Sequence, residues 1–332
     1  MILGTQVMFT LRSLLINIIF MFDLSKVDSL LITGTNGFVG RSIIDQIAKL
    51  DPQHLPNELL LATRQGLDFD LPKNLMPITK VLNQDLAQKW KFDKEVSHII
   101  NLAANGSGSP YSDKANENFT SIVSNLISWV STFKKSLRIF HASSGACSGF
   151  KPINLVSKTV QTKSSFAHNR LQAEESLIKA SSDLGFELSI GRLFTFSGIH
   201  LLERRQYAIV DFIKSAIESN AINITGDPNT VRSYLHQDQL ANWILAALVC
   251  KNPHTNLEIG SSDRVKIKEL AEFIAQETSA RLTFPKEPYK GDVYLPNNQE
   301  TKYKLGVVEG TSWKLAVAEM IKAERKKFHG TF

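Results

Sequence analysis

Three glycines spaced G-x-x-G-x-x-G constrain the fold of this chain more than any other feature. The glycines are Gly34, Gly37 and Gly40. They follow an apolar strand predicted over Leu30–Thr33, and an amphipathic segment begins at Arg41. The first glycine allows a tight turn, the second lets backbone amides approach a pyrophosphate, and the third lets the next helix pack closely on the strand. Glycine-rich turns also occur in loops without a ligand, but a position between a strand and a helix N-terminus favours a dinucleotide-binding site.

After the glycine-rich turn, apolar segments alternate with segments of helical periodicity. Six strands are predicted, over Leu30–Thr33, Leu59–Thr63, Ile78–Leu82, His98–Leu102, Leu137–Ala142 and Glu187–Leu193. Helices are predicted between them, over Arg41–Leu50, Asn116–Phe133 and Ser165–Ala180. This alternation is typical of a parallel sheet with helices on both faces. We therefore predict an α/β fold with a Rossmann-like, doubly wound parallel sheet.

The later part of the chain mixes helices, short strands and loops without any repeat. Helices are predicted there over Asp211–Ser219, Gln239–Cys250 and Lys268–Thr278, followed by an irregular stretch over Pro285–Gln299. This pattern predicts a smaller C-terminal α/β lobe that binds the substrate. We assign residues 28–195 to a dinucleotide-binding domain and residues 196–332 mainly to the substrate lobe, with some segments returning to the main sheet.

Charge and cysteine usage narrow the classes of partner. The chain of 332 residues has a net charge of +6, yet its basic residues are scattered. The dense cluster Glu-Arg-Lys-Lys at 324–327 is typical of a solvated helix end, so no nucleic-acid partner is predicted. Cys147 and Cys250 have neither metal-ligand spacing nor the pattern of a disulfide framework. We predict no metal site and a reducing, cytoplasmic setting.

Residues 1–27 are predicted to be an N-terminal extension. The first 22 residues are apolar apart from Arg12 and a few uncharged polar side chains. The uncharged part after Arg12 is shorter than the roughly 20 apolar residues that a membrane span needs, and the flanks do not match a signal peptide. Met21 lies a few residues before the first predicted strand, which begins at Leu30. An over-long gene start and a weak N-terminal anchor are the two interpretations, and no stable membrane span is expected.

Six further segments follow the glycine motif along the chain: Asn83–Leu86, Asn101–Ala104, Ser143–Gly149, Gly191–Thr195, Val231–Asp238 and Gly291–Val293. With these segments in this order, the chain resembles the extended short-chain dehydrogenase/reductase family, in particular its nucleotide-sugar epimerases, dehydratases and ketoreductases. The similarity extends from about Ser29 to the last helix. It implies hydride transfer between a nucleotide-linked sugar and NADP or NAD, and a homodimer built by the helices over Asn116–Phe133 and Ser165–Ala180.

The resemblance assigns residues to the cofactor. It implies that Asp85 accepts from the adenine amino group, with a helix N-cap as the alternative role. Arg64 stands where an NAD-preferring protein places an acid against the ribose. Arg64 can pair with a 2′-phosphate, which favours NADP, although a solvated arginine is the alternative. The implied cofactor-binding residues are Gly34, Gly37, Phe38, Val39, Gly40, Arg64, Asp85, Leu86, Leu102, Ala103, Ala104, Asn118, Arg170 and Phe194.

Four residues are expected to bind the substrate: Ser144, Thr195, Arg232 and Lys290. The resemblance places Arg232 against the nucleotide or diphosphate, where a cation suits the anion. An ordinary ion pair is the alternative for this residue. Lys290 stands where the family commonly has an arginine, which keeps the charge and loses the bidentate geometry.

The chain departs from the family at its catalytic helix. There, a Tyr-x-x-x-Lys pair works with a Ser or Thr on the preceding strand, and Ser144 occupies that hydroxyl position. Phe166 stands at the tyrosine position and Arg170 at the lysine position. The family's tyrosine exchanges a proton with a sugar hydroxyl, and phenylalanine has no proton to exchange. Arg170 can still hydrogen-bond the nicotinamide ribose.

Three other side chains come into question as the acid or base. Tyr111 is predicted to lie in a loop after Gly106-Ser107-Gly108 that we expect to fold over the site, and it is the better candidate, with an ordinary loop aromatic as the alternative. His168 is two residues from Phe166, about 200° around the helix, so it is predicted to point away from the nicotinamide. His141 is out of phase with Ser144 along the strand.

Two functions follow from these observations. The first is an NAD(P)-dependent epimerase, dehydratase or ketoreductase that acts on a nucleotide-linked sugar. The second is a catalytically inactive protein of the same fold that binds a dinucleotide or sugar nucleotide. Loss of the Tyr and Lys favours the second, whereas retention of Ser144, Arg232 and the glycine motif favours the first. Fold by itself does not decide between them.

Overall fold

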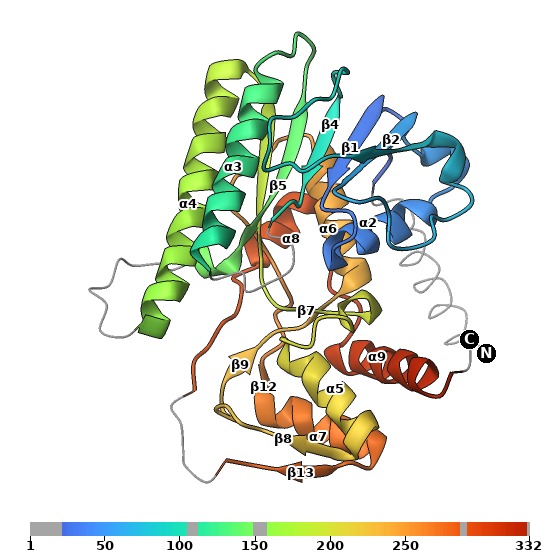
Figure 1. Ribbon diagram of the computed structural model, residues 1–332, viewed down its shortest axis with the longest axis vertical. Helices are drawn as coiled ribbons and strands as arrows, with labels where there is room; N and C mark the ends of the chain where they lie inside the picture. Colours follow the sequence, from blue (N-terminus) through green and yellow to red (C-terminus); the bar gives the residue numbers. More distant parts are fainter. Residues whose placement is uncertain (1–21, 105–111, 149–157, 286–290, 331–332) are drawn as a thin grey trace, which may run out of the picture.

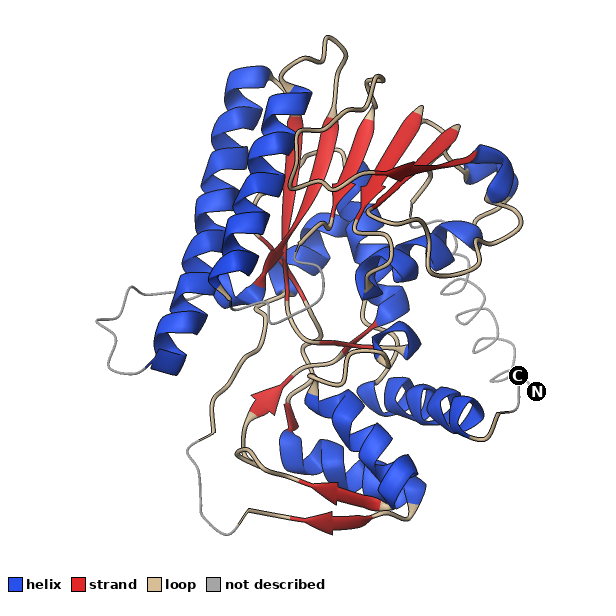
Figure 2. Cartoon of the chain, viewed as in Figure 1, coloured by secondary structure: helices blue, strands red, loops and turns tan. Residues whose placement is uncertain are grey.

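A seven-stranded parallel sheet forms the centre of the molecule (Figures 1 and 2). This computed structural model describes residues 22–104, 112–148, 158–285 and 291–330. The strand order is β11-β6-β5-β4-β1-β2-β3, and every neighbouring pair runs parallel. The strands span Ser29–Thr33 (β1), Glu58–Thr63 (β2), Thr79–Asn83 (β3), His98–Asn101 (β4), Arg138–Ser144 (β5), Glu187–Leu193 (β6) and Leu257–Ile259 (β11). The predicted fold class and its six strands are confirmed.

Two layers of helices cover the sheet because its strands are apolar on both faces. In β1, Leu30 and Ile32 join one buried cluster while Leu31 joins the other, as the two-residue period of a strand requires. The first cluster packs against α2 (Phe38–Ala48) and α6 (Gln237–Val249). The second packs against α3 (Asp113–Val130) and α4 (Lys158–Leu184). Figure 1 shows α3 and α4 side by side on one face.

Helices begin earlier than their apolar periodicity indicates. Helix α2 starts at Phe38, three residues before the predicted start, with Gly37 as N-cap. Helix α3 starts at Asp113, where Ser112 Oγ accepts a hydrogen bond from the Ala115 amide at 3.2 Å. These first turns are polar or glycine-containing, so hydrophobic spacing does not reveal them.

The smaller lobe contains α5 (Ala208–Ser219), α7 (Ile267–Thr278) and α9 (Trp313–Phe328), and it lies at the carboxyl ends of the sheet strands (Figure 1). Three two-stranded sheets accompany these helices, and α8 (Gln299–Leu305) returns to lie beside β11. The small sheets pair β7 (Phe196–Ser197) with β10 (Leu235–His236), β9 (Val231–Arg232) with β12 (Val265–Lys266), and β8 (Ala221–Asn223) with β13 (Arg281–Thr283). Single-turn 3₁₀ helices cover Pro52–His54 (η1), Met76–Ile78 (η2), Gly145–Cys147 (η3) and Ile199–Leu201 (η4).

Both ends of the described chain differ from a simple solvated tail. Phe22, Leu24 and Val27 are buried in the core, so the segment before β1 is packed from Phe22 onwards. At the other end, Glu324 is buried and pairs with Lys214 at 2.7 Å, so the prediction of a solvated helix end is wrong for this residue of the cluster. Among the described residues, no helix combines the length and the apolar character that crossing a membrane requires.

Candidate functional site

The glycine-rich turn is shaped by close backbone contacts that exclude side chains. Gly34 has a φ of +68°, and a Cβ added there would lie 2.9 Å from the Leu102 carbonyl oxygen. A Cβ on Gly40 would lie 2.7 Å from the Gly34 oxygen, nearer than real Cβ atoms approach. Gly37 donates its N–H to the Gly34 oxygen at 3.0 Å and ends the turn as the N-cap of α2. Two of the three glycine roles expected from the sequence, the tight turn and the close helix packing, therefore match this geometry.

Directly after the turn, the first amides of α2 belong to Phe38 and Val39. The first amides of a helix have no carbonyl partner within it, and the positive end of the helix dipole lies there. The Phe38 side chain turns inward and stacks on Phe196, with ring centroids 4.6 Å apart and planes 16° apart. The backbone amides, rather than the side chains, are therefore the groups that this turn offers to an anion.

A buried polar chain fixes the neighbouring strand end. The Thr33 hydroxyl donates to Asn101 Oδ1 at 2.8 Å and accepts from the amides of Leu102 and Ala103 at 3.1 and 3.0 Å. Asn101 Nδ2 in turn donates to His141 Nδ1 at 3.0 Å. These bonds hold the predicted lining segment beside the glycine turn, with Leu102 half-buried, Ala103 buried and Ala104 exposed.

The residues predicted to bind the adenosine end lie on the β2 and β3 side of the turn. Arg64 is exposed just beyond β2, and Asp85 is exposed just beyond β3. One Asp85 oxygen accepts from the Ala87 amide at 3.0 Å in a local turn, and no helix begins at this residue, so it is not the helix N-cap weighed as the alternative. The Leu86 side chain is buried in the core, so only the backbone of Leu86 can offer polar groups at the adenosine end of the site. Asn118 is half-buried on α3.

Arg170, at the family's lysine position, is packed between aromatic rings. Its guanidinium carbon lies 3.3 Å from the ring centroid of Phe119 and 4.7 Å from that of Phe166. The side chain is 5% exposed, and one guanidinium nitrogen donates to Asn169 Oδ1 at 3.2 Å. Burial lowers its pKa to about 10, so it stays charged at neutral pH. In the described part of the chain, no carboxylate lies within 4.0 Å of it, and the ring faces stabilise the cation instead.

Burial keeps the histidine and the cysteine near this site uncharged. His141 is fully buried, and burial followed by the charge of Arg170 lowers its pKa to about 3. Burial, together with the carboxylate of Glu174, raises the pKa of Cys147 to about 11. Neither group changes its charge near neutral pH. His168 is exposed, as predicted for a residue that points away.

Ser144 ends β5 at the carboxyl edge of the sheet. Its Oγ accepts from the Ala146 amide at 3.2 Å, an interaction that leaves its own O–H to donate elsewhere. The neighbouring Ser143 faces the other way and donates to Glu174 Oε1 at 2.5 Å. Glu174 also pairs with Arg192 at 2.6 Å, so this buried ion pair holds β5, β6 and α4 together. The sequence analysis did not identify this network.

A segment after residue 290 links the smaller lobe to the end of β5. Val231 donates its N–H to the Asp292 oxygen at 2.8 Å, and the Tyr294 N–H donates to the Val231 oxygen at 3.1 Å. Arg232 pairs with Asp292 at 2.8 Å, which is the ordinary ion pair weighed as its alternative role. The Tyr294 hydroxyl reaches Gly145: a Cβ added there would lie 2.7 Å from it. Sequence reasoning missed Tyr294, although it directly follows the matched segment Gly291–Val293.

The remaining predicted residues divide into described and undescribed ones. Phe194 is buried at the end of β6 and packs on Tyr294, with ring centroids 4.8 Å apart. Thr195 is half-buried beside it, and its carbonyl accepts from the Leu235 amide at 3.2 Å. Tyr111 and Lys290 lie outside the described residues.

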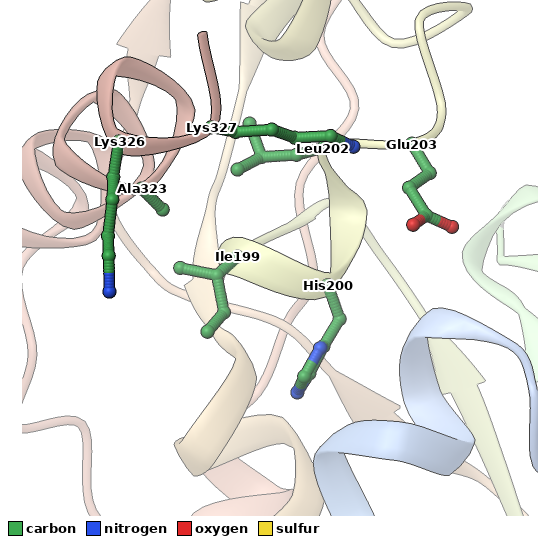
Figure 3. A pocket seen from close by; sticks show the side chains of 7 residues that line it. All are labelled: Ile199, His200, Leu202, Glu203, Ala323, Lys326 and Lys327. Atoms are coloured by element: carbon green, nitrogen blue, oxygen red, sulfur yellow. The ribbon is translucent and has the colours of Figure 1, made fainter. Parts of the chain in front are cut away.

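A separate cavity of about 250 Å³ lies between η4 and the end of α9 (Figure 3). Figure 3 shows Lys326 and Lys327 coming from α9, while His200 projects from η4. The His200 ring bonds Asp45 on α2 at 2.6 Å. None of the residues predicted for cofactor or substrate lines this cavity, so we do not assign it to the candidate site.

Comparison with known proteins gives one family and several similar proteins. The family model described as "NAD dependent epimerase/dehydratase family" matches residues 30–260. A protein of Methanocaldococcus jannaschii named "Putative UDP-glucose 4-epimerase" is 24% identical over 80% of this chain and 88% of its own length.

Solved structures share the fold at lower identity. The Bordetella bronchiseptica enzyme WbmF, in complex with NAD+ and UDP, is 16% identical with a TM-score of 0.73, covering 92% of this chain and 94% of that one. UDP-N-acetylglucosamine 4-epimerase from Methanobrevibacter ruminantium M1, in complex with UDP-N-acetylmuramic acid, is 16% identical with a TM-score of 0.73, covering 91% and 99%.

Proposed function

The chain belongs to the NAD dependent epimerase/dehydratase family, and from this premise we propose that it binds a nicotinamide dinucleotide and acts on a nucleotide-linked sugar by hydride transfer. The reaction class is epimerisation, dehydration or ketoreduction. The observation that carries the proposal is the turn from Gly34 to Gly40, where close backbone contacts leave no room for a Cβ at Gly34 or Gly40 and where the N-terminus of α2 begins. Such a turn costs conformational freedom, and an anion bound to its amides offsets that cost.

The residues present fit the dinucleotide. The amides of Phe38 and Val39 would hold its diphosphate, and the edge formed by Leu102, Ala103 and Ala104 would line its flat groups. Asp85 keeps one carboxylate oxygen for the adenine amino group, because its contact with Ala87 uses the other. When bound, the dinucleotide supplies the acceptor or donor of a hydride.

The substrate end is supported by Ser144, Thr195 and Arg232, which stand at the boundary between the large sheet and the smaller lobe. Arg232 would exchange part of its ion pair with Asp292 for a phosphate oxygen. The named relatives are UDP-sugar epimerases or were solved with UDP or a UDP-sugar, which supports a nucleotide-linked sugar as substrate.

Three finer properties complete the proposal. Arg64 is exposed beyond β2, where it would meet a 2′-phosphate, so we keep the preference for NADP over NAD as a prediction. Helices α3 and α4 pack together on one face and would form the homodimer that the resemblance implies. The cytoplasmic setting stays a prediction, which the free thiols of Cys147 and Cys250 support.

A second function is favoured by one observation. The half-buried Phe166 and the buried Phe119 both pack on Arg170, and in this arrangement neither Phe166 nor Arg170 offers a titratable proton near neutral pH. A protein that binds the dinucleotide or sugar nucleotide without turnover would need no more than this. The two functions predict the same binding and differ in catalysis.

The test begins with fluorescence titration of the purified protein with NADPH and NADH, followed by an assay of UDP-sugar conversion. The proposed enzyme binds one of the dinucleotides and turns over a UDP-sugar. Turnover that appears only after Phe166→Tyr and Arg170→Lys are combined would favour the binding protein. Failure to bind either dinucleotide would contradict both functions.

A further inference from the structure

We propose that the phenol of Tyr294 supplies the proton transfer that Phe166 on α4 cannot supply. The inference rests on the proposed function, because it assigns the acid and base of that reaction. Tyr294 belongs to the smaller lobe and is far in the sequence from α4, the helix that carries Phe166.

The hydroxyl of Tyr294 lies at the carboxyl end of β5. A Cβ built on Gly145 would lie 2.7 Å from this oxygen and 2.7 Å from the Phe194 ring. Gly145 directly follows Ser144, whose hydroxyl is expected to orient the sugar. The missing side chain at position 145 therefore creates the space that the phenol occupies, one residue from the predicted substrate hydroxyl.

Tyr294 is held by contacts to both lobes. The Tyr294 backbone N–H donates to the Val231 oxygen at 3.1 Å, and the adjacent Val293 forms a β-bridge with Val231. On the opposite side the ring packs on Phe194, with centroids 4.8 Å apart and planes 35° apart. Positions fixed by both backbone and ring contacts give the orientation that proton transfer needs.

Charges around the ring suit a phenol that gives and takes a proton. The Arg232 guanidinium lies 5.7 Å from the ring centroid, and it is paired with Asp292 at 2.8 Å. A neighbouring cation favours the phenolate, and the carboxylate moderates that effect. Tyr294 is half-buried rather than enclosed, so part of it remains exposed.

The other candidates among the described residues are less suited. Phe166 has no titratable group, and Arg170 keeps its proton in the aromatic stack. His141 stays neutral below the surface, and Cys147 stays a thiol. Tyr294 combines a hydroxyl group, a half-buried position and proximity to the Ser144 segment.

In the oxidation half of the reaction, a sugar carbon loses two electrons, and the dinucleotide would be the group that accepts them. The O–H bond of the sugar hydroxyl breaks, and its proton passes to the phenolate oxygen of Tyr294 while Ser144 donates a hydrogen bond to the same sugar oxygen. The C–H bond on that carbon breaks at the same time, and an oxidised dinucleotide, when bound, would accept its electron pair as a hydride. The carbon is thereby oxidised to a carbonyl, and the reverse step returns the proton from Tyr294.

The deciding experiment compares Tyr294→Phe with the unchanged protein. We expect kcat for UDP-sugar conversion to fall by about 100- to 1,000-fold, as for loss of a general acid and base. Calorimetric affinities for UDP and for the dinucleotide should stay within about threefold, because the ring and its contacts remain. Tyr303→Phe is the matched control, since Tyr303 is 89% exposed on α8, and it should keep full activity. Adding Phe166→Tyr to Tyr294→Phe should restore at least about tenfold of the lost rate.

Each contrary result has a distinct meaning. Unchanged kcat in Tyr294→Phe would overturn the role of Tyr294 and leave the proposed enzyme intact. Loss of UDP affinity with unchanged kcat would also overturn it, by reducing Tyr294 to a binding residue. An unchanged protein that binds the dinucleotide but never turns over a UDP-sugar would overturn both the enzyme and this role, whereas absence of binding would overturn the dinucleotide site itself.

Discussion

The glycine-rich turn and the face of α4 are two halves of one candidate site. The turn presents main-chain groups, whereas the face of α4 presents side chains. The turn is made of main chain, and its three glycines are required by backbone atoms less than 3.2 Å from any added Cβ. The α4 face is made of side chains, and there Phe166 and Arg170 stack with Phe119 instead of forming an acid and base pair. Binding that relies on backbone shape tolerates few changes, whereas a titratable group can be supplied by another segment.

The largest effect is expected at the turn. Gly40→Val places side-chain atoms where even a Cβ would lie 2.7 Å from backbone, so dinucleotide binding should fall below detection, by more than about 1,000-fold. Fluorescence titration with NADPH and NADH measures this. Gly310→Ala is the control, because its added Cβ meets only the end of Gln239 at 3.8 Å. If the Gly40→Val protein folds and binds the dinucleotide normally, the main-chain shape of the turn does not determine binding.

The next effect concerns the side-chain half. Gly145→Ala should push the Tyr294 hydroxyl and the Phe194 ring from the end of β5, and kcat should fall by about 100-fold. Dinucleotide affinity should fall less than kcat, because the turn at Gly34 is untouched and only the predicted contact of Phe194 with the cofactor shifts. Gly226→Ala, where an added Cβ meets nothing within 4 Å, is the matched control. Equal losses of binding and turnover would mean that the two halves are not separable.

A smaller effect is expected in the pH dependence of stability. His141 has its pKa lowered from 6.5 to about 3 in the folded protein, so the unfolded chain binds the proton more readily. Stability from this residue is complete above pH 6.5 and is lost as the pH falls toward 3, at about 1.4 kcal/mol per pH unit. Urea unfolding from pH 7 to pH 4.5 should show this slope, reduced in His141→Asn and unchanged in the exposed control His168→Gln. A slope equal in all three proteins would contradict the buried neutral imidazole.

The smallest effect tests the cofactor preference. Arg64→Ala should weaken NADPH binding by about tenfold, because one exposed cation next to a 2′-phosphate contributes roughly 1.4 kcal/mol. NADH affinity should change less than twofold, and Lys89→Ala, another exposed cation of this region, should change neither. Equal losses for NADPH and NADH would mean that Arg64 does not distinguish the two coenzymes.

The main-chain half of the site could be predicted from the sequence, whereas the side-chain half could be predicted only in part. Continuous apolar strands and the glycine spacing predicted the sheet and its turn, because local sequence specifies both. Strand β11 has three residues, too few for a periodic pattern. The stack on Arg170 needs Phe119 from another helix, and the contact at Gly145 needs Tyr294 from a distant segment. Such contacts depend on tertiary packing, so a linear motif did not indicate them.

Tyr294 is fastened by its main chain to β9 in the smaller lobe, while its hydroxyl meets the large sheet at Gly145. The amides of Phe38 and Val39 begin α2, which packs on the large sheet, although the Phe38 ring also stacks on Phe196 of the smaller lobe. Rocking of one lobe against the other would therefore alter the spacing between phenol and sugar more than it alters the position of these amides. Turnover would then respond to lobe motion more strongly than coenzyme affinity does, so a sugar that closes the lobes poorly would be bound but converted slowly.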